Sequence, residues 1–198
     1  MNIVYTENYI LPEININEVL HYTTAKSFTN ETRFILNDCI KELGDNYSPK
    51  ICYIKTPVSF LYNCIDFGFM NIESADLRKN LSGYDSAVIF VATIGIEIDR
   101  LIKKYSSISP VKALMFQAIG TERIERLCDL FTDRISEREY AGNRFSPGYG
   151  DLPLTMQKDI IRALNCAKNI GVTLTDSLLM SPTKSVTAII GTKAKKVK

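Results

Sequence analysis

The sequence predicts an α+β protein in which helices flank a mainly antiparallel, twisted sheet. Apolar residues recur at helical spacing in several segments, the longest of which spans about residues 109–139. Short runs at 51–60, 86–92 and 185–190 have the length and composition of strands. The helices and strands do not alternate regularly as βαβ units, so an antiparallel sheet is favoured over a doubly wound parallel one.

The first part of the chain is expected to be mostly helical, with one strand. The strand contains Pro57, which cannot donate a backbone hydrogen bond, so it is expected to be an edge or interrupted strand. In chain order the predicted elements are a helix at 15–24, a helix from a cap at Thr29 or Asn30 to Gly44, a strand at 51–60, and a helical segment from Ser74 through Leu81 that stops at Gly83.

The middle of the chain is expected to hold a buried strand and the longest helix. Residues 86–92 form a short, continuous apolar run with β-branched residues, which is typical of a buried strand. The elements that follow are a turn at Thr93-Ile94-Gly95, a helix at 96–105, and the longest helix from Ser109-Pro110 to about Glu139, ended by Gly142.

The sequence of the last part of the chain predicts one helix and two strands. Thr155 caps a helix that extends to about Asn169, and Gly171 closes it. Residues 174–179 and 185–190 read as strands, and the turn between them would allow the two to pair as a hairpin.

Bulk composition is that of a globular protein. The 198 residues suit one compact domain, or one large domain with a small appendage, and 45% of them are hydrophobic. The five cysteines are odd in number and lack CxxC spacing, which argues against a disulfide framework and a zinc site. A single histidine, His21, excludes a histidine-rich metal centre, and the sequence predicts no metal site.

Charge and hydropathy predict a cytoplasmic protein that binds neither nucleic acid nor membrane. Four of the 24 basic residues are lysines within residues 193–198; without them, 20 basic side chains face 22 acidic ones. The N-terminus lacks a basic region followed by a long apolar run, so no secretory signal is expected. No stretch reaches the roughly 18 apolar residues that a membrane helix needs.

The segment 144–153, RFSPGYGDLP, is the strongest candidate for a binding site. Gly148 and Gly150 allow backbone amides to approach a ligand, and the prolines hold an extended path. Arg144 offers a planar fork for a carboxylate or phosphate, and Tyr149 offers a flat face and a hydroxyl. These residues suit a cradle for an amino-acid or nucleotide ligand; a plain surface loop fits them equally well.

Glu125 is a second candidate, because it lies on the longest helix. It shares a face with Glu122, three residues before it, and a carboxylate there could meet an ammonium group. On the residues alone, a solvated helix face on which Glu125 pairs with Arg123 or Arg126 is favoured. The turn at 93–95 could likewise bind an anion at a helix N-terminus, although a simple strand-to-helix turn is favoured.

Several motifs in one order resemble a known family, the activation domain of cobalamin-dependent methionine synthase. The run from Arg144 to Pro153 resembles that domain's RPAPGYPACP segment. Residues 170–177, followed by Met180, Pro182, Ser185 and Val186, resemble its TGMKLTESFAMWPGASVSG run, and residues 92–97 resemble a strand ending in TGGLEE. The resemblance covers about residues 84–191 and is especially close to short, free-standing forms of the domain.

The resemblance implies a site for S-adenosylmethionine. Glu125 would contact the amino group of the ligand and Arg144 its carboxylate. The backbone around Ser146, Pro147 and Gly148 would hold the adenosyl portion, with Tyr149 packed beside it. No catalytic residue is implied, because the domain positions a methyl donor.

The implied function is that of an accessory subunit in the reductive methylation of cob(II)alamin within a split methionine synthase. Cobalamin would be held by a partner subunit, and an electron donor such as flavodoxin would act as the reductant. Residues 1–83 would form the N-terminal part of the same domain, 84–191 the binding core and 192–198 a basic tail. The alternatives are reactivation of another corrinoid methyltransferase, and a small-molecule sensor or interaction module without methyl transfer.

Overall fold

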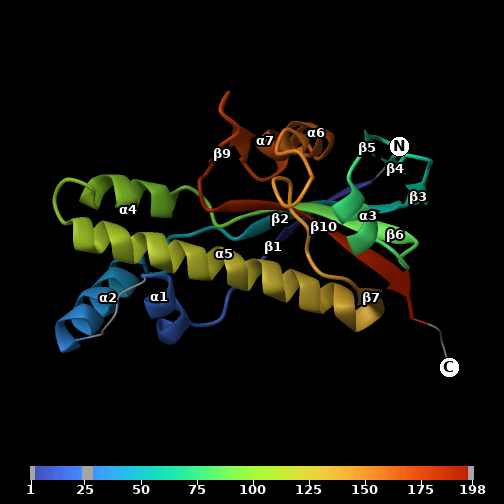
Figure 1. Ribbon diagram of the computed structural model, residues 1–198. Coiled ribbons are helices and arrows are strands. Elements are labelled where there is room, and N and C mark those ends of the chain that lie inside the picture. The colour runs from blue at the N-terminus through green and yellow to red at the C-terminus, as the bar shows by residue number, and fades with distance from the viewer. Residues whose placement is uncertain (1–2, 24–28, 196–198) are drawn as a thin grey trace.

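A computed structural model describes residues 3–23 and 29–195 and is built on a five-stranded, fully antiparallel sheet (Figure 1). The sheet order is β1-β2-β6-β10-β7. Its strands are β1 (Val4–Asn8), β2 (Lys50–Pro57), β6 (Ser86–Thr93), β7 (Glu139–Ala141) and β10 (Ser185–Ala194). The predicted α+β class with an antiparallel sheet and flanking helices is therefore confirmed.

Helices cover both faces of this sheet. The long helix α5 crosses it with α1, α2 and α4 packed alongside, while α3, α6 and α7 contribute to the core on the other face (Figure 1). The helices are α1 (Ile16–Tyr22), α2 (Asn30–Leu43), α3 (Ala75–Asn80), α4 (Glu97–Tyr105), α5 (Pro110–Arg138), α6 (Met156–Ala163) and α7 (Cys166–Asn169).

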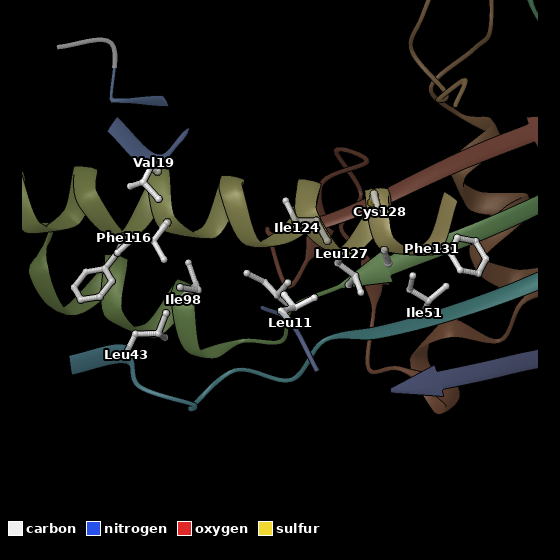
Figure 2. Packing of buried hydrophobic residues seen from close by; sticks show 14 of the residues in the cluster. Leu11, Val19, Leu43, Ile51, Ile98, Phe116, Ile124, Leu127, Cys128 and Phe131 are labelled. Carbon is white, nitrogen blue, oxygen red and sulfur yellow. The ribbon is translucent and has the colours of Figure 1, made fainter. Parts of the chain in front are cut away.

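The central strand β6 explains why the sheet is covered twice. Successive side chains of a strand point to opposite faces of the sheet, and β6 presents apolar side chains to both faces. Val88 and Phe90 belong to the core under α5, whereas Ile89 and Val91 belong to the core under α6. The ring of Phe131 from α5 lies 4.9 Å from that of Phe90, centroid to centroid, and Figure 2 shows the α5 side of this core.

Caps predicted from the sequence are present at several helix starts. The side chains of Thr29, Ser74 and Ser109 accept hydrogen bonds from backbone amides in the first turns of α2, α3 and α5. Of the two alternatives for 51–60, the interrupted strand is confirmed: β2 ends at Pro57 and β3 (Ser59–Phe60) joins a small separate sheet with β4 (Ile65–Asp66) and β5 (Asn71–Ile72). The edge strand is wrong, because β2 lies between β1 and β6.

The predicted hairpin between 174–179 and 185–190 is wrong. Instead β8 (Thr173–Leu174) pairs with β9 (Met180–Ser181) in a two-stranded sheet, and β10 pairs antiparallel with β6. Residues 185–190 pair with the buried central strand β6, and all of them except the half-buried Val186 are buried, which a two-stranded hairpin on the surface could not achieve.

The boundaries of three further predicted segments compare with the structure as follows. The helix expected from Thr155 to Asn169 breaks into α6 and α7 because Asn165 adopts a left-handed conformation with φ 46°. The longest helix ends at Arg138, as predicted to within one residue, and the chain forms β7 before it reaches Gly142. The expected tail begins inside β10, since Thr192–Ala194 pair with β7; residues 196–198 lie outside the described part.

Four of the five cysteines are buried, as expected of small core residues. Burial raises the pKa of the Cys128 thiol to about 12. None of the helices in the described part of the chain is both long and apolar enough to span a bilayer.

Candidate functional site

The segment 144–153 forms a fixed strip between β7 and α6. Phe145 begins it with a two-way bridge to β10: its N–H donates to the carbonyl oxygen of Ile189, and its carbonyl accepts from Ile189 N–H, both at 2.9 Å. A tight turn follows, in which Tyr149 N–H donates to the carbonyl oxygen of Ser146 at 3.1 Å. Pro147 and Gly148, with φ +94° at the glycine, occupy the central positions that a type II turn requires.

Asp151 ties the strip to the start of α3. Its carboxylate accepts hydrogen bonds from the Ser74 hydroxyl and from the amide of Ala75, the latter at 2.7 Å. In return Asp151 N–H donates to the Asp76 carboxylate at 3.2 Å. The hydrogen bond from Ser74, supported by the backbone amides, lowers the pKa of Asp151 below its ordinary value.

Gly150 permits this close approach. A Cβ atom at this position would lie 2.2 Å from Oδ2 of Asp76, and the backbone φ is +53°. Both the contact and the left-handed backbone require glycine here. The close approach of the strip to α3 therefore accounts for the glycine between Tyr149 and Asp151.

A pocket of about 360 Å³ lies beside the strip. Its wall combines α5, the strip, α6 and the segment from β9 into β10. The lining residues are Glu125, Arg144, Ser146, Pro147, Tyr149, Gln157, Met180, Ser185, Val186 and Thr187. Side chains separated by up to 62 positions in the chain thus meet in one concavity.

The pocket occupies a stretch where the outer edge of β10 is left open. Within the described chain, the outer neighbours of β10 are β7, which pairs with Thr192–Ala194, and Phe145, which pairs with Ile189. Backbone groups of a strand point alternately to its two sides. Because Ile189 and Gly191 bond outward, the N–H and C=O of Thr187 also point outward, toward the pocket.

Arg144 lies at the charged end of the pocket. Its Nη2 is 3.1 Å from Glu125 Oε2 and 3.0 Å from Asp129 Oδ1, both carboxylates of α5. Glu125 thus pairs with Arg144, and the pairing with Arg123 or Arg126 that the residues alone favoured is wrong. The other terminal nitrogen of Arg144, Nη1, is buried and has no hydrogen-bond partner within the described residues.

The neighbouring Glu122 has a different role. It forms a fully buried ion pair with Arg123, and that pair holds the chain before α1: Arg123 donates to the carbonyl oxygens of Pro12 and Glu13. Helix α1 packs against α5; burial, and after it the charge of Glu125, raises the pKa of Tyr22 at the end of α1.

Five of the six predicted site residues line the pocket, and the sixth, Gly148, shapes the turn beside it. Sequence reasoning missed Gln157, Asp129 and the wall formed by Met180 and 185–187 as site residues. Met180, Ser185 and Val186 had a signal, since they belong to the run that resembles the family; Gln157 had none, being one polar residue in the first turn of a helix.

The turn at Thr93-Ile94-Gly95 does not line the pocket, although the Ser185 hydroxyl in the pocket wall donates to that of Thr93 at 2.9 Å. Gly95 N–H donates to the Thr93 hydroxyl oxygen at 3.2 Å, and a Cβ at Gly95 would meet Ser48 at 3.3 Å. This is the strand-to-helix turn that the sequence favoured. His21 is exposed in the last turn of α1, in edge contact with Tyr22.

Comparisons with known proteins confirm the resemblance. Residues 123–197 match the family described as "Vitamin B12 dependent methionine synthase, activation domain". Among solved structures, the chain resembles one titled "Crystal Structure of the MetH Reactivation Domain bound to AdoHcy", with a TM-score of 0.68 and 16% identity over 98% of this chain and 80% of that one. At that identity the likeness establishes the fold. No curated protein matches.

Proposed function

We propose that this chain binds S-adenosylmethionine in the strip pocket and acts as the accessory subunit for reductive methylation of cob(II)alamin in a split cobalamin-dependent methionine synthase. The family match and the fold support a reactivation role. The observation that carries the ligand assignment is Arg144, held between two carboxylates with one buried nitrogen left over.

The charged groups of the pocket complement those of the ligand. Arg144 suits the ligand carboxylate, to which a guanidinium can donate two parallel hydrogen bonds. Glu125 and Asp129, each already beside Arg144, suit the ligand ammonium. Two carboxylates and one guanidinium carry one net negative charge, and S-adenosylmethionine carries one net positive charge. Binding would exchange the ion pairs of Arg144 for equivalent pairs with the ligand.

The strip supplies the rest of the cradle in this proposal. The backbone of Ser146, Pro147 and Gly148 holds the adenosyl portion, and Tyr149, whose side chain is exposed at the pocket, packs beside it. The hydrogen bonds of Asp151 to α3 fix this strip before the ligand arrives, which lowers the entropy lost on binding.

The chain contributes binding and orientation, and no general base is required. When bound, S-adenosylmethionine would supply a methyl group made electrophilic by its sulfonium and would leave as S-adenosylhomocysteine. Cobalamin held by a partner subunit would receive the methyl group, with one electron from a donor such as flavodoxin. Holding the donor in one orientation gives the proximity that such a transfer needs. In this reading residues 84–191 form the binding core, 1–83 complete the same domain, and the protein works in the cytoplasm.

Calorimetry with S-adenosylmethionine tests the assignment. Wild type should bind, and Arg144→Ala should raise the Kd about 10- to 100-fold, because charge-assisted hydrogen bonds to the carboxylate are lost. Arg162→Ala is a matched control, since Arg162 is largely exposed on α6 and pairs with Asp159. Absence of binding by folded wild type would overturn the proposal.

The partner assignment needs a separate assay. Mixing the chain with a cobalamin-loaded methionine synthase subunit, a reductant and S-adenosylmethionine should convert the cob(II)alamin spectrum to that of methylcobalamin. Omitting the chain should abolish the conversion. Conversion of a different corrinoid protein, with none for the methionine synthase subunit, would instead favour the alternative partner.

A further inference from the structure

Gln157 is a buried polar side chain in the wall of the pocket, apart from the charged groups around Arg144. It is the second residue of α6 and is 6% exposed. Its Oε1 is buried and has no hydrogen-bond partner within the described residues. Buried acceptors are nearly always paired, so an orphan that lines a pocket indicates a group that the ligand completes.

Two orphans of opposite character line the same pocket. Arg144 Nη1 is a donor and Gln157 Oε1 is an acceptor. A ligand that satisfies both must present an acceptor to Arg144 and a donor to Gln157. In S-adenosylmethionine the carboxylate is the acceptor suited to Arg144, while the charged ammonium is drawn to Glu125 and Asp129. The donors left for Gln157 belong to the nucleoside.

Helix α6 begins against the turn that would hold the adenosyl portion. Leu154 Cδ1 lies 3.4 Å from where a Cβ of Gly148 would be, and Gln157 N–H donates to the carbonyl oxygen of Leu154 at 3.1 Å. The first turn of α6 is therefore packed on the strip. Met180, also in the pocket wall, adds a polarisable apolar contact for a flat ring.

We propose that Gln157 determines specificity for the base, by accepting a hydrogen bond from the 6-amino group of adenine. A glutamine amide presents an acceptor beside a donor, and an adenine edge presents a donor beside an acceptor, so the two match in a bidentate pair. Without that amino group, the buried Gln157 oxygen stays unpaired in the complex. This inference rests on the proposed function.

The test compares two ligands on three proteins by calorimetry. The ligands are S-adenosylhomocysteine and its analogue whose purine lacks the 6-amino group. Wild type should prefer the adenine ligand about tenfold, as expected for one hydrogen bond to a buried group. Gln157→Leu should bind both about equally. Gln117→Leu, the same change at an exposed position of α5, should keep the wild-type preference.

The outcomes separate the inference from the proposed function. If Gln157→Leu weakens both ligands by one factor and keeps the preference, Gln157 does not contact the amino group and the inference fails. A third ligand, the 2′-deoxyribose analogue of S-adenosylhomocysteine, tests whether Gln157 instead accepts from the 2′-hydroxyl of the ribose. If wild type discriminates against this analogue and Gln157→Leu does not, the partner of Gln157 is the ribose and the inference is also wrong. If folded wild type binds none of these ligands, the proposed function fails as well.

Discussion

At the scale of single residues, the site depends on how Arg144 is shared. Its Nη2 lies at nearly equal distances from Glu125 and Asp129, 3.1 and 3.0 Å, so neither carboxylate holds it alone. Both carboxylates are partly exposed, which keeps each ion pair weak and exchangeable. A zwitterionic ligand can therefore replace these contacts without leaving a buried charge unpaired.

Asp129→Asn should reduce the preference for S-adenosylmethionine over S-adenosylhomocysteine. The methyl donor carries one more positive charge than its product, and the variant removes one negative charge from the pocket. We expect the affinity ratio, measured by calorimetry, to fall about two- to fivefold, in line with exposed charge pairs. Asp159→Asn, on the exposed face of α6, should leave the ratio unchanged. An unaltered ratio in Asp129→Asn would remove Asp129 from the ligand site.

At the scale of elements, the strip is held by contacts at both ends. Phe145 bridges β10, and Asp151 bonds α3, so the turn between them is pre-formed. The close contact of Gly150 with Asp76 is part of the second anchor. Disturbing that anchor should therefore affect binding as well as stability.

Gly150→Ala should destabilise the protein and weaken S-adenosylmethionine binding. The new methyl group would force Asp76 away from the strip, in addition to the strain of a left-handed alanine. We expect a loss of roughly 1–3 kcal/mol in urea unfolding, together with a higher Kd. Gly171→Ala is the matched control, because Gly171 has φ +74° with open space around it. Equal effects of the two variants on binding would contradict a role for the anchor.

The hydrogen bonds of Asp151 to α3 should also make the stability of the fold depend on pH in the acid range. The pKa of Asp151 is lowered in the folded state, so its contribution to stability is present above the ordinary aspartate pKa of about 4 and disappears as pH falls through the lower folded value. Asp151→Asn should therefore be less stable than wild type at neutral pH, with the difference narrowing below pH of about 4. Thermal unfolding across this range, with exposed Asp45→Asn as control, measures it; a constant difference would refute the assignment.

Local sequence signals predicted where helices begin, but they did not predict which strands pair with each other. Thr29, Ser74 and Ser109 indicated helix starts because a cap acts within one turn. The hairpin was wrong because the partner of β10 lies on β6, about a hundred residues earlier, and no local pattern records that choice. Strand β1 escaped prediction altogether, since the mixed sequence of Val4–Asn8 is exposed or half-buried at an edge.

At the scale of the whole molecule, one buried ion pair joins the N-terminal segment to the helix that carries the site. Glu122 and Arg123 are fully buried on α5, and Arg123 donates to Pro12 and Glu13 while Glu122 accepts from Asn15 N–H at 3.2 Å. Helix α1 follows this segment and packs against α5, the helix that carries Glu125 and Asp129. The pair therefore helps to set one side of the site from a distance.

Arg123→Met should strongly destabilise the fold. It leaves Glu122 buried without its counter-charge, and breaking such a pair costs about 3–5 kcal/mol. The double variant Glu122→Gln with Arg123→Met should recover part of the loss, since no unpaired charge remains. Urea unfolding of wild type and both variants measures this; a single variant as stable as wild type would show that the pair does not hold the N-terminal segment.

The assembled pocket could not be derived from residue chemistry alone. Arg144 and the strip suggested an amino-acid or nucleotide ligand, but Glu125 gained its place opposite Arg144 only through the family resemblance. Gln157 and the open edge of β10 became visible only in three dimensions, because they depend on where α6 and β10 meet the strip.

A crystal structure of the protein grown with S-adenosylmethionine would show directly where the ligand binds. We expect the ligand in the strip pocket, with its carboxylate on Arg144, its ammonium within hydrogen-bond distance of Glu125, and the direct Arg144–Glu125 contact of 3.1 Å opened. A ligand bound elsewhere on the molecule, with the contacts of Arg144 to Glu125 and Asp129 unchanged, would contradict it.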